Sequence, residues 1–277
     1  MGLASAWNDF SGRAVLVTGG TKGIGLATAL AFGQRGAEVT ITHRWGSADL
    51  AAVQEAFRTV GAAAPAVVDA DAAQAEDVRA VLSGIRERHG RIHALVSNVA
   101  FAPLIRSFED YTRRGLAAAI DYSAWPIVAH TQASREIFGA YPKYVIGLSS
   151  EGGVGYHINY DMIAAAKAAL ETLCRYMHHR LRGHDCRVNV VRTRFVRTES
   201  LRATAGDGFE PFAAARSPGL FTPAEEVARA IVGLCSGLMD GVGGQIVTVD
   251  RGAGLFDSLG RLYAEQAPDA LESAATG

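Results

Sequence analysis

The sequence has little net charge, few cysteines and no long apolar run, and each shortage argues against a class of protein. The 277 residues carry a formal net charge of −1, whereas a nucleic-acid-binding protein normally shows a basic excess. The three cysteines, Cys174, Cys186 and Cys235, are far apart and form no Cys-x-x-Cys pair, as expected for reduced thiols in a cytosolic protein. No apolar run reaches the roughly 20 residues that cross a bilayer, and the N-terminal segment lacks the apolar core of a signal peptide. We therefore expect a cytoplasmic protein without a membrane or nucleic-acid partner.

Hydrophobic residues are abundant, at 49% of the chain, and they alternate between strand-like and helix-like patterns. Short apolar segments predict seven strands, at 14–18, 38–42, 64–70, 93–98, 144–150, 186–192 and 245–250. Helical patterns lie at 25–36, 47–61 with Ser47 as a cap, 76–90, 107–139 around an unexplained Pro126, and 160–182. This alternation predicts an α/β fold, a Rossmann-type doubly wound parallel sheet with helices on both faces. We expect one domain over 1–277, with a lid at about 195–222 and a frayed tail at about 262–277.

A glycine-rich turn follows the first predicted strand. The stretch "TGGTKGIG", residues 18–25, places Gly19, Gly23 and Gly25 between that strand and a helix. A pyrophosphate must approach backbone N–H groups closely, which a Cβ atom would prevent, and the helix N-terminus favours its negative charge. A glycine cluster alone can serve a tight turn and nothing else, but the strand before it and the helix after it favour dinucleotide binding.

The spacing Thr-Gly-x-x-x-Gly-x-Gly resembles that of the short-chain dehydrogenase/reductase family, and the likeness extends over residues 12–256. The stretches "VVDAD", "VNVV" and "GGQIVTVD" are similar to the end of the family's third strand and to its last two strands. The resemblance implies that Asp69 faces the adenine of a nicotinamide cofactor. It further implies cofactor contacts by a wider set of residues: Gly19, Thr21, Lys22, Gly23, Ile24, Gly25, Ala70, Asn98, Lys167, Val196 and Thr198.

The second predicted strand ends in cations. An Asp or Glu at this place binds the ribose diol of NAD, whereas His43 and Arg44 stand here and Lys22 lies in the glycine turn. An Arg–Lys pair attracts a 2′-phosphate through charge-assisted hydrogen bonds. These residues could be solvated surface cations, but their joint position favours NADPH as the cofactor.

A tyrosine and a lysine follow the fifth predicted strand at an unusual spacing. The family pattern is Tyr-x-x-x-Lys, but here Ile163 stands four residues before Lys167 and Tyr160 stands seven before it. Seven helical residues rotate by about 700°, so Tyr160 and Lys167 would share one helix face, with the tyrosine displaced by about one turn, ~4.5 Å. The lysine is expected to hold the nicotinamide ribose and to lower the pKa of the tyrosine.

The displaced tyrosine suits the reduction of a carbon–carbon double bond. In a ketone, the carbon that accepts hydride bears the oxygen that needs a proton. In an α,β-unsaturated thioester, hydride adds to the β-carbon while charge develops on the carbonyl oxygen, two bonds further along, where a tyrosine hydroxyl could stabilise it. We expect Tyr160 and Lys167 to be catalytic. Ser150 would either donate to the thioester oxygen or cap a strand end, and Tyr156 is the reserve acid.

Local stretches narrow the resemblance. The segments 96–103, 120–129 and 159–171 resemble bacterial enoyl-acyl-carrier-protein reductases and related enoyl-CoA reductases, including their Asn-Tyr-x6-Lys pattern. The chain departs from known patterns at Ser150, where that group often has a second tyrosine. It also departs at Asp121, where ketoreductases place a relay asparagine, and at Thr193-Arg194, where Pro-Gly is expected. The resemblance implies an NADPH-dependent enoyl-thioester reductase that forms a homotetramer and acts on an acyl-carrier-protein or coenzyme A thioester.

Two other functions stay open at this stage. One is an NADPH-dependent ketoreductase of a ketoacyl or polyketide-type substrate, and the other is a non-catalytic NADP-binding sensor. His178, His179 and His184 lack a completing Cys or carboxylate, so we expect no metal site. Arg192, Arg194 and Arg197 are candidates to attract the phosphates of coenzyme A or an acidic carrier protein.

Overall fold

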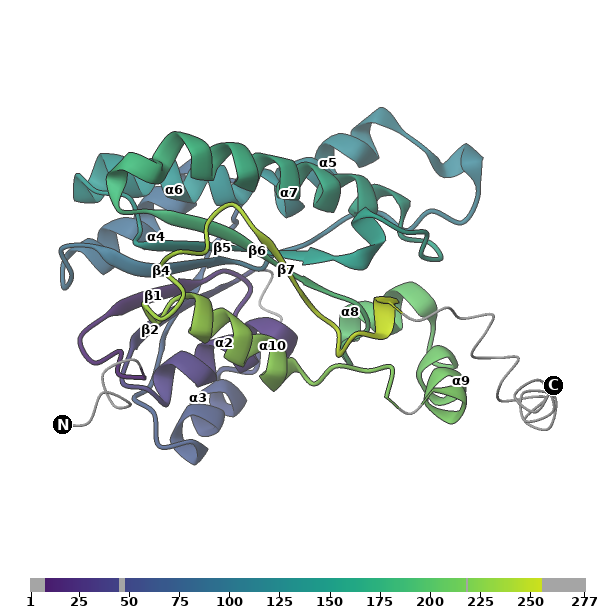
Figure 1. Ribbon diagram of the computed structural model, residues 1–277, viewed down its shortest axis with the longest axis horizontal. Coiled ribbons are helices and arrows are strands. Elements are labelled where there is room, and N and C mark those ends of the chain that lie inside the picture. The colour runs from purple at the N-terminus through teal and green to yellow at the C-terminus, as the bar shows by residue number, and fades with distance from the viewer. Residues whose placement is uncertain (1–7, 45–47, 218, 256–277) are drawn as a thin grey trace, which may run out of the picture.

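The computed structural model describes residues 8–44, 48–217 and 219–255, and in them a seven-stranded sheet lies between two layers of helices (Figure 1). The strand order is β3-β2-β1-β4-β5-β6-β7, and every neighbouring pair is parallel. The strands are β1 (Ala14–Val17), β2 (Glu38–His43), β3 (Ala66–Asp69), β4 (Ile92–Ser97), β5 (Tyr144–Ser150), β6 (Arg187–Thr193) and β7 (Ile246–Val249). The order reverses direction between β1 and β4, as in doubly wound folds. The predicted fold class and strand number are therefore confirmed.

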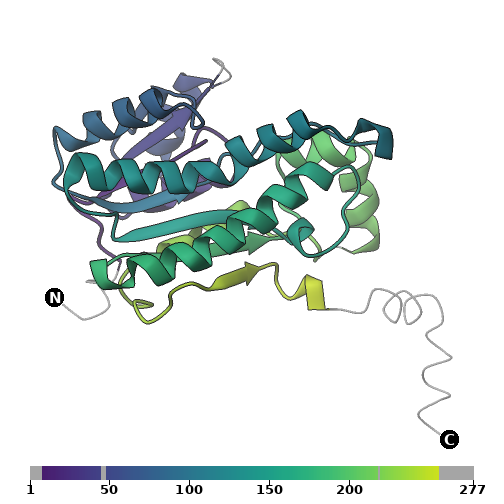
Figure 2. The same cartoon turned by 90° about the horizontal axis from the view of Figure 1, so that it is seen from above.

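Helices cover both faces of the sheet. One face carries α2 (Gly23–Gly33), α3 (Leu50–Thr59) and α10 (Ala224–Leu234). The other face carries α4 (Ala75–Arg86), α5 (Arg113–Ser123), α6 (Trp125–Phe138) and α7 (Asp161–Leu181). Figure 2 looks down on this second layer, whose blue and teal helices lie over the sheet. The green segment with α8 (Glu199–Ala205) and α9 (Phe209–Arg216) lies toward one end of the molecule.

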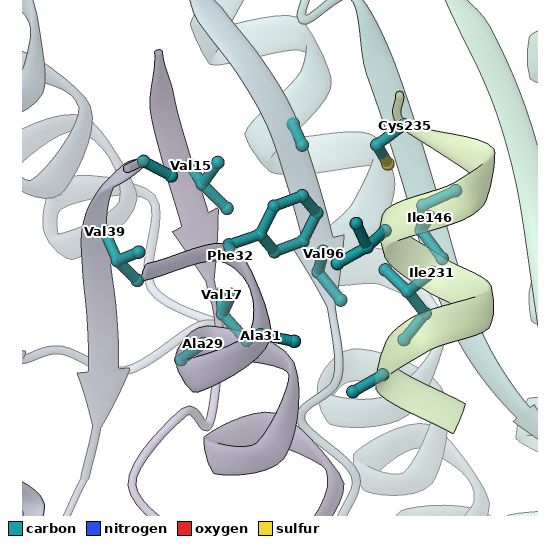
Figure 3. Packing of buried hydrophobic residues seen from close by; sticks show 14 of the residues in the cluster. Val15, Val17, Ala29, Ala31, Phe32, Val39, Val96, Ile146, Ile231 and Cys235 are labelled. Carbon is teal, nitrogen blue, oxygen red and sulfur yellow. The ribbon is translucent and has the colours of Figure 1, made fainter. Parts of the chain in front are cut away.

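The central strands are buried on both faces, because their side chains alternate between two apolar cores. Along β1, Val15 and Val17 belong to the core under α2 and α10, whereas Leu16 belongs to the core under α4 and α6. Phe32 of α2 fills the first core between the strands and Ile231 of α10 (Figure 3). Full burial of such side chains contributes about 1.5–3 kcal/mol each, so two complete cores hold the strand ends in fixed positions.

Some sequence-based boundaries need correction. The single helix predicted for 107–139 is a 3-10 turn, η1 (Phe108–Asp110), followed by α5 and α6, which meet at Ala124. Pro126 lies in the first turn of α6, where the missing N–H has no helical partner to lose, so it begins a helix instead of breaking one. The cap of α3 is Asp49, whose side chain accepts a hydrogen bond from Ala52 N, while Ser47 lies outside the described residues.

The segment after β6 contains helices that the sequence analysis does not predict. The proposed lid, 195–222, contains α8 and α9, and α10 follows it as a helix that the sequence reading missed. The sequence contains a helical pattern here, because apolar residues recur at helical spacing. The buried ones are Val227, Ala228, Ile231 and Val232. The predicted tail at 262–277 lies outside the described residues. Within the described ranges, no helix combines the length and apolar character needed to span a bilayer.

Candidate active site

A cavity of about 920 Å³ opens at the carboxyl ends of the strands. Its walls come from the segments that follow β1 to β6, from α7 and from the lid. Where consecutive crossovers turn to opposite faces of a parallel sheet, the loops part and leave such a crevice. This cavity therefore lies where doubly wound folds bind ligands.

Glycines shape the turn at the cofactor end of the cavity. Gly19 and Gly23 adopt positive φ values of +63° and +55°, which residues with a Cβ rarely tolerate. A Cβ on Gly25 would lie 2.2 Å from Gly19 O and 2.6 Å from Asn98 Nδ2. Asn98 pins the turn by donating from Nδ2 to Gly19 O at 2.9 Å and to Thr18 O at 3.1 Å. The N-terminus of α2 thus faces the cavity, where it can accept an anionic group.

Most of the predicted cofactor residues line the cavity: Gly19, Thr21, Lys22, Gly23, Ile24, His43, Arg44, Ala70, Asn98, Lys167, Val196 and Thr198. Gly25 does not line it, because it is packed against the turn behind it. The placement expected for Asp69 needs correction, because this residue ends β3 with an exposed side chain away from the cavity. Asp71 lies at the cavity instead, since the chain crosses the top of the sheet only after the strand has ended. Its side chain accepts a hydrogen bond from Ala73 N at 3.0 Å, and an Asp closing such a turn is a signal that the sequence reading could have used.

The cations at the end of β2 already have partners. Arg44 forms an ion pair with Asp71 and donates to the hydroxyl of Tyr122, and its guanidinium lies 5.5 Å from the centre of the Tyr122 ring. Tyr122, from α5, donates to Asp71 Oδ2 at 3.2 Å. Lys22 Nζ lies 2.5 Å from Glu199 Oε2 at the start of α8, which joins the glycine turn to the lid. These cations therefore line the cavity with carboxylates beside them.

Tyr160 and Ser150 line another part of the same cavity. Tyr160 is the N-cap of α7 and not a helical residue, so the expected helical rotation applies only from Asp161 onward. Asn159, with a φ of +57°, turns the chain into the helix and donates from Nδ2 to Thr204 O of α8 at 3.2 Å. A Cβ on Gly152 would lie 2.4 Å from the Tyr160 ring, so glycine at this position makes room for the phenol.

Two shifts in pKa follow from this burial. Burial raises the pKa of Tyr160, and its hydrogen bond with Ser150 opposes that shift, so the phenol carries its proton at neutral pH. Burial lowers the pKa of Lys167 to about 8, opposed by Cys174 and Glu171. The Lys167 ammonium donates to Leu148 O at 2.6 Å, and the hydrogen bonds found among the described residues include none from it to Tyr160. Both side chains line the same cavity.

Other predicted residues divide between the cavity and its surroundings. Ile163 lines the cavity, and Tyr156 lies at its mouth with 88% of its surface exposed. Asp121 is exposed on α5 and does not reach the cavity. Arg192 is held by Glu171 at 2.6 and 2.8 Å and so cannot serve as a free phosphate-binding cation. Arg194 does line the cavity, with Glu151 at 2.9 Å.

The sequence reading missed a row of rings on the cavity wall. His157, Phe195 and Phe209 follow one another outward from Tyr160, with centroid separations of 6.1, 5.4 and 5.2 Å along the row. They come from the loop before α7, the segment after β6 and the helix α9. Their only shared sequence signal is aromatic character within loop-like segments, which does not predict that they meet.

Comparisons with known proteins agree with this geometry. The model of a family described as Enoyl-(Acyl carrier protein) reductase matches residues 19–254. The chain is 26% identical over 260 residues to an enoyl-[acyl-carrier-protein] reductase [NADH] of Aquifex aeolicus, and the alignment covers 90% of this chain and 94% of that protein. It is 30% identical over 247 residues to a 1-cyclohexenylcarbonyl-CoA reductase of Streptomyces collinus, covering 86% and 85%. It is also 30% identical over 257 residues to a 3-oxoacyl-[acyl-carrier-protein] reductase of Mycobacterium bovis, covering 89% and 94%.

Proposed function

Because the chain belongs to the family described as Enoyl-(Acyl carrier protein) reductase, within the short-chain dehydrogenases/reductases, we propose that it reduces the double bond of an enoyl thioester with NADPH. Membership makes the protein an oxidoreductase that uses a nicotinamide cofactor. The thioester class, the phosphate on the cofactor and the roles of the residues below are our proposal.

One observation carries the choice of double-bond reduction. The position four residues before Lys167 is Ile163, whose side chain lines the cavity, while Tyr160, which also lines it, stands at the start of α7. An isoleucine cannot protonate a ketone oxygen beside the carbon that accepts hydride. A hydroxyl displaced from that position suits a substrate whose carbonyl oxygen lies two bonds beyond the reduced carbon. The Tyr160 phenol, protonated at neutral pH, would donate a hydrogen bond to the enolate oxygen as its charge develops.

The residues of the cavity fit a bound dinucleotide. The backbone of Gly19 and Gly23 is open to the N-terminus of α2, and these glycines would cradle the pyrophosphate. Lys167 would turn from Leu148 O to the nicotinamide ribose hydroxyls, a short movement for a side chain that already lines the cavity. The bound nicotinamide supplies the hydride.

The choice of NADPH rests on Lys22, His43 and Arg44, which line the cavity around the end of β2. No carboxylate stands at the end of that strand to hold a ribose diol. The guanidinium of Arg44 already pairs with Asp71, and a 2′-phosphate would compete for it as a second anion. The Aquifex relative is named as an NADH enzyme, so cofactor preference is a property on which this chain is proposed to differ.

A product analysis tests the proposal. The protein is incubated with NADPH and either a crotonyl or an acetoacetyl thioester, on coenzyme A and on acyl-carrier protein in parallel. We expect conversion of the crotonyl thioester to the butyryl thioester, seen as a mass gain of two hydrogens. Reduction of the acetoacetyl thioester alone would reject the proposal.

Two observations favour reduction of the acetoacetyl thioester instead. Ser150 and Tyr160 both line the cavity and Ser150 influences the pKa of Tyr160, as expected of the hydroxyl pair of a ketoreductase, and the Mycobacterium bovis relative is named as a 3-oxoacyl reductase. Ketone reduction is therefore the second candidate. Binding of NADPH without turnover of either thioester would instead support a sensor. A homotetramer and a cytoplasmic location remain predictions, of which the first is checked by sedimentation equilibrium.

A further inference from the structure

His157 lies inside the cavity, and the proposed function gives it no role. It belongs to the loop between η2 (Glu151–Gly153) and α7, and its half-buried ring lines the cavity. The ring centre lies 6.1 Å from that of Tyr160 and 5.4 Å from that of Phe195. A titratable ring is thus held beside the phenol that would bind the substrate oxygen.

Charged groups from two other elements act on this ring. Glu151, from η2, favours the protonated imidazolium, while Arg194, from the segment after β6, disfavours it. Glu151 and Arg194 pair with each other at 2.9 Å, and Arg194 also donates to Ala253 O at 2.6 Å. Among the described residues, Glu151 and Arg194 are the charged groups that influence the pKa of His157, and Tyr160 at the start of α7 is a titratable ring beside it. The ion pair fixes the electrostatic surroundings of the imidazole.

Reduction of an enoyl thioester needs a proton at the α-carbon. After hydride adds to the β-carbon, the electron pair of the former double bond rests on the enolate. A phenol that only hydrogen-bonds the enolate oxygen does not place a proton on carbon. If the phenol does transfer its proton to oxygen, the resulting enol must still gain a proton on carbon and return one to the phenolate. In both cases a second acid supplies the net proton.

The other cavity-lining groups near Tyr160 suit this role poorly. Ser150 acts on the pKa of Tyr160, and its own alcohol group is a very weak acid. Lys167 lies deep in the site with its ammonium directed to Leu148 O. Tyr156 is 88% exposed at the mouth of the cavity, so little of the protein surrounds its phenol to hold it in place. An imidazolium exchanges protons near neutral pH, and the partial exposure of His157 allows it to recover its proton from water.

We propose that His157 is the acid that protonates the α-carbon of the substrate, while Tyr160 holds the enolate oxygen. The inference rests on the proposed enoyl-thioester reduction. Hydride forms the new C–H bond at the β-carbon, and the proton on the His157 imidazolium forms the new C–H bond at the α-carbon. The imidazole then takes a proton from water, so the net reaction consumes one hydride and one proton. Protonation by a fixed side chain occurs on one face of the enolate.

The pH dependence follows from the surroundings of His157. Burial, the largest influence, lowers the pKa of His157 below its ordinary value of 6.5, and Glu151 partly offsets this effect. The acid form is therefore lost as pH rises through that lowered pKa. Turnover limited by α-carbon protonation should decline above it.

The stereochemistry of the product separates this role from a structural one. A crotonyl thioester is reduced in D2O with NADPH carrying deuterium as the transferred hydride, and the two diastereomers of the 2,3-dideuterated butyryl product are measured by NMR. The wild-type protein is compared with His157→Gln, with His157→Ala with and without added imidazole, and with His179→Gln, an exposed histidine at the far end of α7. NADPH binding, by fluorescence, checks that each variant is folded.

The wild type and His179→Gln should each give one diastereomer. His157→Gln should bind NADPH normally, turn over about 10²-fold more slowly and give a mixture, because solvent deuterates both faces of a long-lived enolate. Imidazole should accelerate His157→Ala. A single diastereomer at a near wild-type rate from His157→Gln would overturn the inference and leave the proposed function standing. If the wild type reduces no enoyl thioester, the proposed function fails and the inference fails with it.

Discussion

The two ends of the cavity are built by different means. At the cofactor end, the turn at 18–25 takes its shape from glycine backbone and from Asn98, within a short stretch between β1 and α2. At the substrate end, the loop before α7, the segment after β6 and the lid bring Tyr160, His157 and Phe195 together through side-chain contacts. A site formed by the backbone accepts few residue types at each position, so the sequence alone can reveal it. A site shaped by side chains depends on how distant segments pack.

Removal of the Tyr160 hydroxyl should have the largest effect and should spare the cofactor end. We expect Tyr160→Phe to lower kcat for an enoyl thioester by about 10²–10³-fold, because a preorganised donor to the developing oxyanion is lost. NADPH affinity should be unchanged in a fluorescence titration. Tyr176→Phe, which changes a 69% exposed tyrosine within α7, is the matched control. Undiminished turnover of Tyr160→Phe would move the donor elsewhere, with Tyr156 tested next.

The buried Lys167 should leave a signature in the pH dependence of stability. The pKa of Lys167 falls from 10.5 to about 8 in the folded protein, so between these values the unfolded chain binds more protons. The contribution of this lysine to the free energy of unfolding should therefore rise from pH 8 to 10.5, by about 3 kcal/mol at most. The measurement is the difference between wild type and Lys167→Met in urea unfolding across that range. A difference that stays constant with pH would contradict a lowered pKa of Lys167 in the folded protein.

A methyl group at Gly25 should damage the cofactor end. The new Cβ of Gly25→Ala would lie 2.2 Å from Gly19 O, a backbone atom that can move only if the turn deforms. We expect a loss of about 1–3 kcal/mol of stability and a marked weakening of NADPH binding. Gly84→Ala in α4, where nothing lies within 4 Å of the new atom, should instead stabilise by about 0.5–1 kcal/mol. Equal effects of the two substitutions would show that the close approach at Gly25 has no consequence.

Substitutions that alter the preference for NADPH over NADH should have the smallest effect, because the cations proposed to bind the 2′-phosphate are already paired with carboxylates. Arg44→Ala should raise the KM for NADPH by about tenfold and leave that for NADH nearly unchanged, since one charge-assisted contact to the 2′-phosphate is lost. Asp71→Asn should act in the opposite direction, because it frees the Arg44 guanidinium from its carboxylate partner. The ratio of kcat/KM for the two cofactors measures both effects. A wild-type preference for NADH would reject the proposed role of Arg44.

The sequence anticipated the features that local chemistry dictates and missed those that depend on packing. The seven strands, their parallel doubly wound sheet and the glycine turn were predicted, because short apolar segments and glycine are direct requirements of those elements. The resemblance pointed to Asp69, whereas Asp71 lines the cavity, because the resemblance of a short stretch does not fix where the chain leaves β3. The sequence leaves Pro126 unexplained, because the role of a proline depends on whether a helix begins beside it.

By itself, the sequence determined a doubly wound sheet with a phosphate-binding turn at its centre, since hydrophobic periodicity and glycine spacing are local properties of the chain. Only the tertiary structure decided that Asp71 and Tyr122 partner Arg44, that Lys167 points to Leu148 O, and that His157 stands beside Tyr160. These contacts join side chains from different strands and loops. Their distances are fixed by how two hydrophobic cores set the strand ends, and no short stretch of sequence contains that information.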